Sequence, residues 1–219
     1  MALDVATVDL ALTTTRSVRK RLDFSRPIPE SVLQECIDIS LQSPTGSNAQ
    51  GWRVIVVTDA AKRKALADLY RRGFQMYQDA GLAPQHEAGD IRAEQMPRVI
   101  DSAVYLAEHL HEAPAMVIYC IEGRMENGPM IMQASLYGSV LPAAWSFMIA
   151  ARARGIGSAW TTIHLFYEKE AAEVLGIPES FTQTVLLPVA YFKGEDFKPA
   201  KRVSPRDLTY WNAWGKTRR

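Results

Sequence analysis

The stretch MIMQASLYGSVLPAAWSFMIAA, residues 130–151, contains no charged side chain. Its length would suffice to cross a lipid bilayer. However, Pro142 lies inside it, and polar side chains interrupt it at Gln133, Ser135, Tyr137, Ser139 and Ser146. We therefore expect a long helix buried in a folded core, and not a membrane span.

Small residues recur along this helix at helical spacing. Ala134, Gly138 and Pro142 form one row, and Ser135 and Ser139 lie beside it. Such rows let another helix approach closely, and in a chain of 219 residues that helix could come from a second subunit. Left on a monomer, it would expose a large apolar patch. The stretch therefore predicts a homodimer.

The segments on either side follow helix and strand patterns without strict alternation. Helices are expected over residues 3–15, from 29 to about 41, and over 60–80, 98–112, 129–154 and 167–175; strands are expected over 52–58, 115–121, 156–162 and 182–192. Residues 81–96 are weakly patterned, and 195–219 form an irregular extension rich in Lys, Arg and Trp. This order predicts an α+β fold in a single domain, residues 1–219.

Composition excludes several classes of protein. The chain is 47% hydrophobic with a net charge of +1, which excludes a disordered chain, a globally basic nucleic-acid binder and an acidic tail protein. Its two cysteines, Cys36 and Cys120, lie in apolar stretches, as expected for core thiols in a reducing compartment. The start carries Asp4 and Asp9 and no basic region before its apolar residues, so we expect no signal peptide and a cytoplasmic protein.

Common catalytic motifs are absent. The sequence has no GxxxxGK[ST] loop, GxGxxG fingerprint, HExxH, CxxC or GxSxG elbow. Neither a metal site nor a side-chain nucleophile is therefore expected. His164 could line a site, or it could be an ordinary loop histidine.

The first positive signal is TRSVRKR, residues 15–21, called here the arginine segment. A guanidinium group can donate two parallel hydrogen bonds to phosphate oxygens, and a hydroxyl adds a neutral donor. Arg16, Ser17 and Arg19 therefore suit a phosphate. Alone, this motif fits a solvated basic turn better.

The second signal is SPTGSNAQGW, residues 43–52, called here the polar loop. Gly46 allows close approach of a backbone, while Thr45, Ser47 and Asn48 supply donors and acceptors for the edge of a flat heterocycle. A plain turn between a helix and a strand explains the same residues.

The third signal is RGIGSAWTTIH, residues 154–164, called here the glycine arm. Its glycines let a ligand or another backbone come close to the strand that follows. The alternative is a helix C-cap at Gly155 before an ordinary strand.

In this order and spacing, the three segments resemble the FMN-dependent nitroreductase family. The run LGIP at 175–178, the run VLLPVAY at 185–191 and the basic pair Lys201-Arg202 extend the resemblance over residues 10–205. It implies a mixed, mostly antiparallel sheet between helices and an intertwined homodimer with two FMN sites at its interface. The extension from about residue 195 is expected to wrap the partner subunit.

The resemblance also implies roles for single residues. The FMN phosphate would be held by Arg16, Ser17, Arg19 and Arg202. The isoalloxazine would be lined by Pro44, Thr45, Gly46 and Asn48, some of them from the partner, and covered on its other side by Trp160, Thr161 and Thr162. Gly157 would let that strand approach the flavin. Ser47, Phe74 and Tyr77 would face an aromatic substrate.

The reaction implied is hydride transfer from NADPH or NADH to FMN, and then reduction of a nitroaromatic, quinone or related acceptor. Because no separate dinucleotide fold is expected, donor and acceptor would share one pocket and alternate in it. Three alternatives stay open: another FMN reaction on the same fold, such as reductive dehalogenation or enone reduction; a protein that stores or senses FMN without turnover; and an interaction domain with no cofactor.

Overall fold

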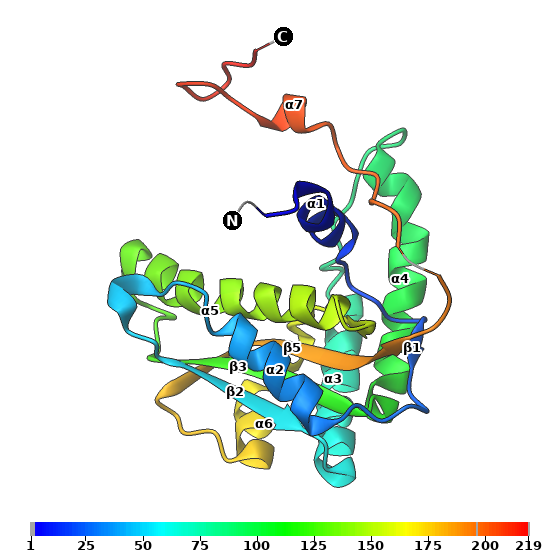
Figure 1. The fold of residues 1–219 in the computed structure, drawn as a ribbon, viewed down its shortest axis with the longest axis vertical. Coiled ribbons are helices and arrows are strands. Elements are labelled where there is room, and N and C mark those ends of the chain that lie inside the picture. The colour runs from blue at the N-terminus through cyan, green and yellow to red at the C-terminus, as the bar shows by residue number, and fades with distance from the viewer. Residues whose placement is uncertain (1–2, 196, 219) are drawn as a thin grey trace.

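A five-stranded sheet forms the centre of the computed structural model, which describes residues 3–195 and 197–218 (Figure 1). The strands are β1 (Leu22–Asp23), β2 (Trp52–Val57), β3 (Ala115–Glu122), β4 (Ile156–Ser158) and β5 (Phe181–Phe192). Their order is β1-β5-β3-β2, and β4 also pairs with β5. Every pair of these strands is antiparallel. The predicted α+β class is confirmed.

Helices cover both faces of the sheet (Figure 1). Its α-helices are α1 (Val5–Thr14), α2 (Glu30–Ser40), α3 (Ala60–Asp79), α4 (Ile91–His109), α5 (Met130–Arg152), α6 (Glu168–Leu175) and α7 (Pro205–Leu208), and three short 3₁₀ turns are η1 (Gly46–Asn48), η2 (Leu110–Glu112) and η3 (Ile163–Tyr167). Helices α2 and α5 pack on one face, and α3 and α6 pack on the other.

The alternation of side chains along the central strands explains these two layers. On β3, Val117 and Tyr119 join the core beneath α5, whereas Met116 and Ile118 join the core beneath α3. Successive strand residues point to opposite faces, so a strand buried on both sides must be apolar throughout. Both cysteines are buried free thiols, as predicted.

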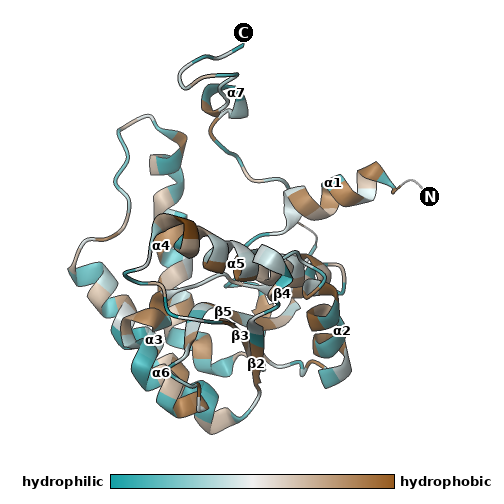
Figure 2. Cartoon of the chain, turned by 90° about the vertical axis from the view of Figure 1, so that its left-hand side faces the viewer, coloured by the Kyte–Doolittle hydropathy of each residue, from teal (hydrophilic) through white to brown (hydrophobic). Residues whose placement is uncertain are grey.

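Helix α5 is the predicted long uncharged helix. It is long and apolar enough to cross a membrane, but half of its most apolar stretch is buried inside the fold, as in a core helix. Its remaining face carries an exposed stripe at helical spacing, formed by Ile131, Ala134, Gly138, Pro142 and Trp145. Helix α1 stands beside α5 and is also apolar and exposed (Figure 2).

Three elements differ most from the sequence-based expectation. Helix α4 begins at Ile91 instead of residue 98, because Asp90 caps it through the Arg92 N–H and the helix continues through Pro97. The strand expected over 156–162 ends at Ser158, although Thr161 rejoins the sheet in a single bridge to Leu186. Strand β1 was not expected, since two residues are too few to show a period.

Candidate functional site

The arginine segment and the glycine arm lie side by side. The Val18 N–H donates to the Ser158 carbonyl at 2.7 Å, and the Trp160 N–H donates to Ser17 Oγ at 3.1 Å. A Cβ placed on Gly157 would lie 3.1 Å from the Cβ of Val18. The glycine is therefore needed for the packing of Val18, and its predicted role toward a flavin stays a prediction.

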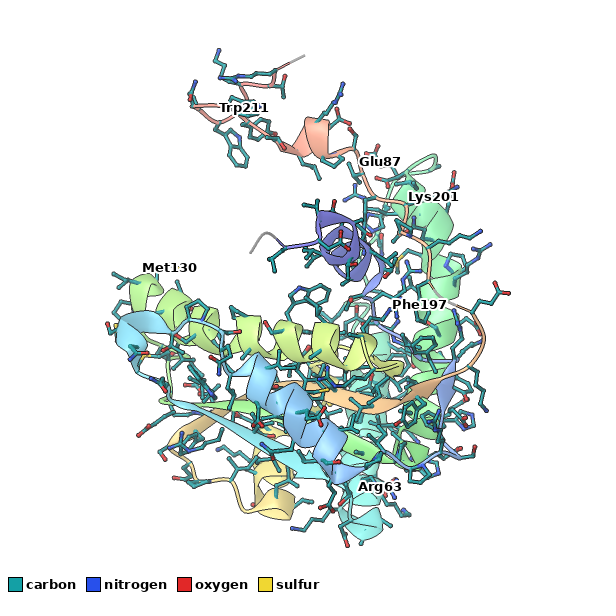
Figure 3. The ribbon with its side chains drawn as sticks, viewed as in Figure 1. Arg63, Glu87, Met130, Phe197, Lys201 and Trp211 are labelled. Atoms are coloured by element: carbon teal, nitrogen blue, oxygen red, sulfur yellow. The ribbon has the colours of Figure 1, made fainter. Side chains whose placement is uncertain are left out.

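Arg16 and Arg202 meet on one side of the arginine segment. They line a single cavity of about 270 Å³ together with Trp145 of α5. The chain that carries Arg202 leaves β5, passes Phe197 and runs up along α4, where Gln95 Nε2 donates to the Lys201 carbonyl at 3.2 Å (Figure 3). Two cationic side chains that are far apart in sequence therefore line the same cavity.

Ser17 and Arg19 face the other side. Successive residues of an extended segment point in opposite directions, so Ser17 reaches the glycine arm, and Arg19 Nη1 reaches Ser102 Oγ of α4 at 3.4 Å. The structure thus separates the four predicted phosphate ligands into two pairs, Arg16 with Arg202 and Ser17 with Arg19.

None of these arginines has an acidic partner among the residues that the structure describes. Arg19 is half-buried, and burial lowers the pKa of its guanidinium. By contrast, Lys20 in the same segment pairs with Asp101 at 2.5 Å. Half-buried cations without a counter-ion favour an anionic ligand, so Arg16 and Arg19, with the exposed Arg202 lining the same cavity as Arg16, provide a site suited to an anion.

A buried tyrosine of α3 contacts the glycine arm. Tyr70 Oη is 3.2 Å from Thr161 Oγ1, and the backbone of Thr161 pairs with Leu186 in both directions at 3.2 and 2.9 Å. Burial raises the pKa of Tyr70, while the charge of Arg19 acts to lower it. Trp160 is half-buried and Thr162 is exposed beside this pair.

The polar loop packs against the first half of α5. The Gly46 N–H donates to Ser139 Oγ at 2.9 Å, and a Cβ on Gly46 would lie 2.5 Å from Ser135 Oγ. The polar loop of the same chain therefore makes the close contact with the row formed by Ser135 and Ser139. The neighbouring row of α5 stays open, and a Cβ on Gly138 would meet nothing within 4 Å.

The backbone of the polar loop is strained. Ser47, Asn48 and Gln50 have φ values of 52°, 55° and 50°, a region that favours glycine. Thr45 Oγ1 accepts from the Gln50 N–H at 3.1 Å and helps to hold the loop. Pro44, Ser47 and Asn48 are exposed. Strained backbone of this kind clusters at ligand clamps, which supports the loop as part of a site.

The polar loop and the arginine segment lie toward opposite ends of α5 (Figure 1). Ser139 contacts the loop, and Arg152 Nη2 donates to Thr14 Oγ1, next to the arginine segment, at 3.3 Å. Thirteen residues separate Ser139 from Arg152, which corresponds to about 20 Å along the helix axis. One chain therefore brings the arginines and the glycine arm together but leaves the loop apart.

The predicted substrate residues lie on α3. Phe74 and Tyr77 stack with ring centroids 6.5 Å apart. Phe74 is only 9% exposed and belongs to the core beneath α3, whereas Tyr77 is half-buried. Tyr70, Phe74 and Tyr77 follow helical spacing along one face. The sequence analysis missed Tyr70 because a buried tyrosine on an amphipathic helix gives no signal of its own.

Known proteins resemble this chain over most of its length. The sequence profile of the nitroreductase family matches residues 12–191. An NADH dehydrogenase from Thermus thermophilus is 23% identical over 222 residues, which covers 95% of this chain and 96% of that protein.

Solved structures share the fold. An FMN-dependent nitroreductase from Mycobacterium smegmatis in complex with NADPH has a TM-score of 0.68 and 19% identity, covering 96% of this chain and 100% of that one. An iodotyrosine deiodinase bound to FMN and 3-iodo-L-tyrosine has a TM-score of 0.69 and 20% identity, covering 94% and 99%.

Proposed function

The chain belongs to the nitroreductase family, and we propose that it is an FMN-dependent oxidoreductase that takes a hydride from NADH or NADPH and reduces nitroaromatics, quinones or related acceptors. The observation that carries this proposal is a set of arginines, Arg16 and Arg19 in the arginine segment and Arg202 in the cavity shared with Arg16, which form no ion pair with a carboxylate of the described residues. The phosphate of FMN would supply the missing negative charge.

The residues present fit FMN. Arg16 and Arg202 share a cavity into which a phosphate can be received by paired guanidinium donors. Ser17, on the other side of the segment from that cavity, contacts the glycine arm, where Trp160, Thr161 and Thr162 would cover one face of the ring. Gly46 and its neighbours Pro44, Thr45 and Asn48 would line the other face.

Bound FMN would supply the redox chemistry, accepting a hydride from NAD(P)H and passing the electrons to the acceptor. The residues of this chain would orient the ring and set the electrostatic potential around it. Arg19 lies in the arginine segment, whose backbone is hydrogen-bonded to the glycine arm at Val18 and Ser158. Its charge would favour the more negative, reduced form of the cofactor.

We further propose that the site is completed in a homodimer. Within one chain the polar loop and the arginines lie toward opposite ends of α5, so a twofold partner would bring its own loop to the arginines of the first chain. The exposed uncharged stripe of α5 is the surface that supports such contact. The extension from residue 195, with Trp211 and Trp214 exposed, would wrap the partner.

A cytoplasmic location is part of the proposal. Cys36 and Cys120 are both free and buried. Burial raises the pKa of Cys120 to about 12, which keeps its thiol protonated and unreactive. Unpaired thiols of this kind suit a reducing compartment.

Steady-state kinetics tests the proposed reaction. Because the residues described form no separate dinucleotide-binding fold, NAD(P)H and the acceptor would share the pocket above the ring, near Ser47 and Tyr77. Double-reciprocal plots with a nitroaromatic or quinone should then give parallel lines. Intersecting lines with a demonstrated ternary complex would contradict a shared pocket.

Reductive dehalogenation is a second candidate reaction, because an iodotyrosine deiodinase shares the fold. Reductive dehalogenation would use the same cofactor site with another occupant of the pocket. Release of iodide from 3-iodo-L-tyrosine by the chemically reduced protein, with no turnover of nitroaromatics or quinones, would favour it. FMN binding without oxidation of NADH, NADPH or any other reductant would favour storage.

A further inference from the structure

Phe197 is anchored where the C-terminal extension leaves the sheet (Figure 3). Its ring centroid lies 5.0 Å from that of Phe192, the last residue of β5. The half-buried ring also packs against a small core formed by Val18, Leu22 and Ala190. The start of the extension is therefore fixed to a core that includes a residue of the arginine segment.

Three guanidinium groups gather around the ring of Phe197. The Cζ atoms of Arg21, Arg152 and Arg16 lie 4.2, 5.6 and 6.0 Å from its centroid. Arg21 also holds the backbone of the extension, because its Nε donates to the Lys193 carbonyl at 2.7 Å. An aromatic face attracts a guanidinium group at such distances through the quadrupole of the ring. The ring therefore offsets part of the repulsion between three positive charges.

Arg16 is the one of these three arginines that lines the cavity of about 270 Å³ shared with Arg202. Pro199 and Ala200, two and three residues after Phe197, line the same cavity. Phe197 thus contacts one wall of the cavity through Arg16 and begins the segment that forms the other. An aromatic ring holds a guanidinium group without neutralising it, whereas a carboxylate would neutralise it. Arg16 therefore keeps its charge for an anion in the cavity.

We propose that Phe197 is a positioning residue for the phosphate of the cofactor, and that its ring holds the charged Arg16 guanidinium at the cavity shared with Arg202. This inference rests on the proposed function. Because the ring acts through a cation that would bind phosphate, its loss should affect a flavin that carries a phosphate and spare one that does not. A phenylalanine that only filled space would affect both flavins equally.

The variant Phe197→Leu removes the aromatic face and keeps an apolar side chain against the small core. We expect the affinity for FMN to fall roughly threefold to tenfold, the effect of one lost cation–π contact. The affinity for riboflavin, which has no phosphate, should stay at the wild-type value. Fluorescence titration of the apoprotein with each flavin measures the two affinities.

Two further variants test whether the ring acts through Arg16. Phe197→Tyr keeps an aromatic face and should bind FMN as the wild type does. In an Arg16→Ala background, Phe197→Leu should change FMN affinity by less than about twofold, because the cation that the ring holds is already gone. Losses that simply add in the double variant would contradict a role through Arg16.

Phe24→Leu is the matched control for loss of an aromatic ring. Phe24 is half-buried and packs against the same small core as Phe197. It should bind both flavins as the wild type does. If Phe197→Leu fails to fold, pentafluorophenylalanine at position 197 replaces it, since this residue keeps a six-membered ring and reverses the sign of the quadrupole. The same selective loss of FMN affinity is expected.

The outcomes separate the two claims. A wild-type protein that binds no FMN contradicts the proposed function and this inference with it. A wild-type protein that binds FMN, with FMN affinity unchanged in the folded variant at position 197, overturns the role of Phe197 alone. Equal losses of FMN and riboflavin affinity in that variant overturn it as well.

Discussion

At the scale of single residues, Arg16, Arg19 and Arg202 form no ion pair with a carboxylate of the described residues, whereas Lys20 pairs with Asp101. Arg16→Ala and Arg19→Ala should each weaken FMN binding roughly tenfold to a hundredfold, since a charge-assisted hydrogen bond contributes about 1.5–3 kcal/mol. Fluorescence titration of the apoprotein with FMN measures this loss. Arg202→Ala should act in the same direction, with a smaller effect if Lys201 compensates.

Lys20→Ala is the control for these arginines. Lys20 lies in the same segment but forms an ion pair with Asp101. Both side chains are exposed, so the pair contributes little to stability. FMN affinity should stay within a few-fold of the wild type. Equal losses in Lys20→Ala and Arg16→Ala would mean that general positive charge, and not a phosphate site, attracts the cofactor.

His164 gives the folded chain a pH dependence. It is fully buried, no residue that the structure describes forms a hydrogen bond with either ring nitrogen, and burial lowers its pKa from 6.5 to about 4. Between these values the unfolded chain binds the proton and the folded chain does not, so the free energy of unfolding falls as the pH falls. From pH 7.5 to pH 5 the loss should be about 2 kcal/mol.

Urea unfolding of His164→Leu at these two pH values tests this origin. The variant should lose most of the difference between pH 7.5 and pH 5, whereas His111→Leu, at an exposed position, should keep it. A His164→Leu protein with the pH dependence of the wild type would assign the effect to other groups.

At the scale of elements, the contact between α3 and η3 fixes the glycine arm. A Cβ on Gly73 would lie 2.7 Å from the Ile163 carbonyl oxygen, a backbone atom that cannot rotate away. Gly73→Ala should therefore destabilise the protein by about 1–3 kcal/mol and weaken FMN binding, because Ile163 follows Thr161 and Thr162 directly.

The direction of the change in unfolding free energy of Gly73→Ala tests the contact between α3 and η3. Helix propensity alone favours alanine over glycine by about 1 kcal/mol. Urea unfolding that shows a more stable Gly73→Ala protein would contradict the close contact between α3 and η3.

Elements with a strong period could be predicted from sequence, and contacts between elements could not. The uncharged run identified α5, and the apolar runs identified β3 and β5. The glycines at 46 and 157 were recognised as points of close approach, but the groups that approach them, Ser135 and Val18, come from segments distant in sequence. The same limit hid Tyr70, whose contact with the glycine arm is made through Thr161.

At the scale of the whole molecule, the stripe on α5 predicts a dimer that shares its cofactor sites. A side chain at Gly138 meets nothing within 4 Å in its own chain, so Gly138→Glu should fold. It should instead place an unpaired charge in the contact between subunits, which is strongly unfavourable. We expect the dimer and the flavin to be lost together, as seen by light scattering and flavin fluorescence.

Ala61→Glu provides the comparison, since it adds the same charge at an exposed position in the first turn of α3. It should remain dimeric and keep its flavin. A Gly138→Glu monomer that still holds FMN tightly would show that one chain forms the whole site.

The central claim is that this chain binds FMN and reduces it with NAD(P)H, and the visible spectrum of the purified protein tests it most directly. The account predicts a yellow protein whose heat-released cofactor is FMN, whose absorbance is bleached by NADH or NADPH without oxygen, and whose colour returns with a nitroaromatic or quinone. No flavin in protein refolded with FMN, or FAD as the released cofactor, would contradict it.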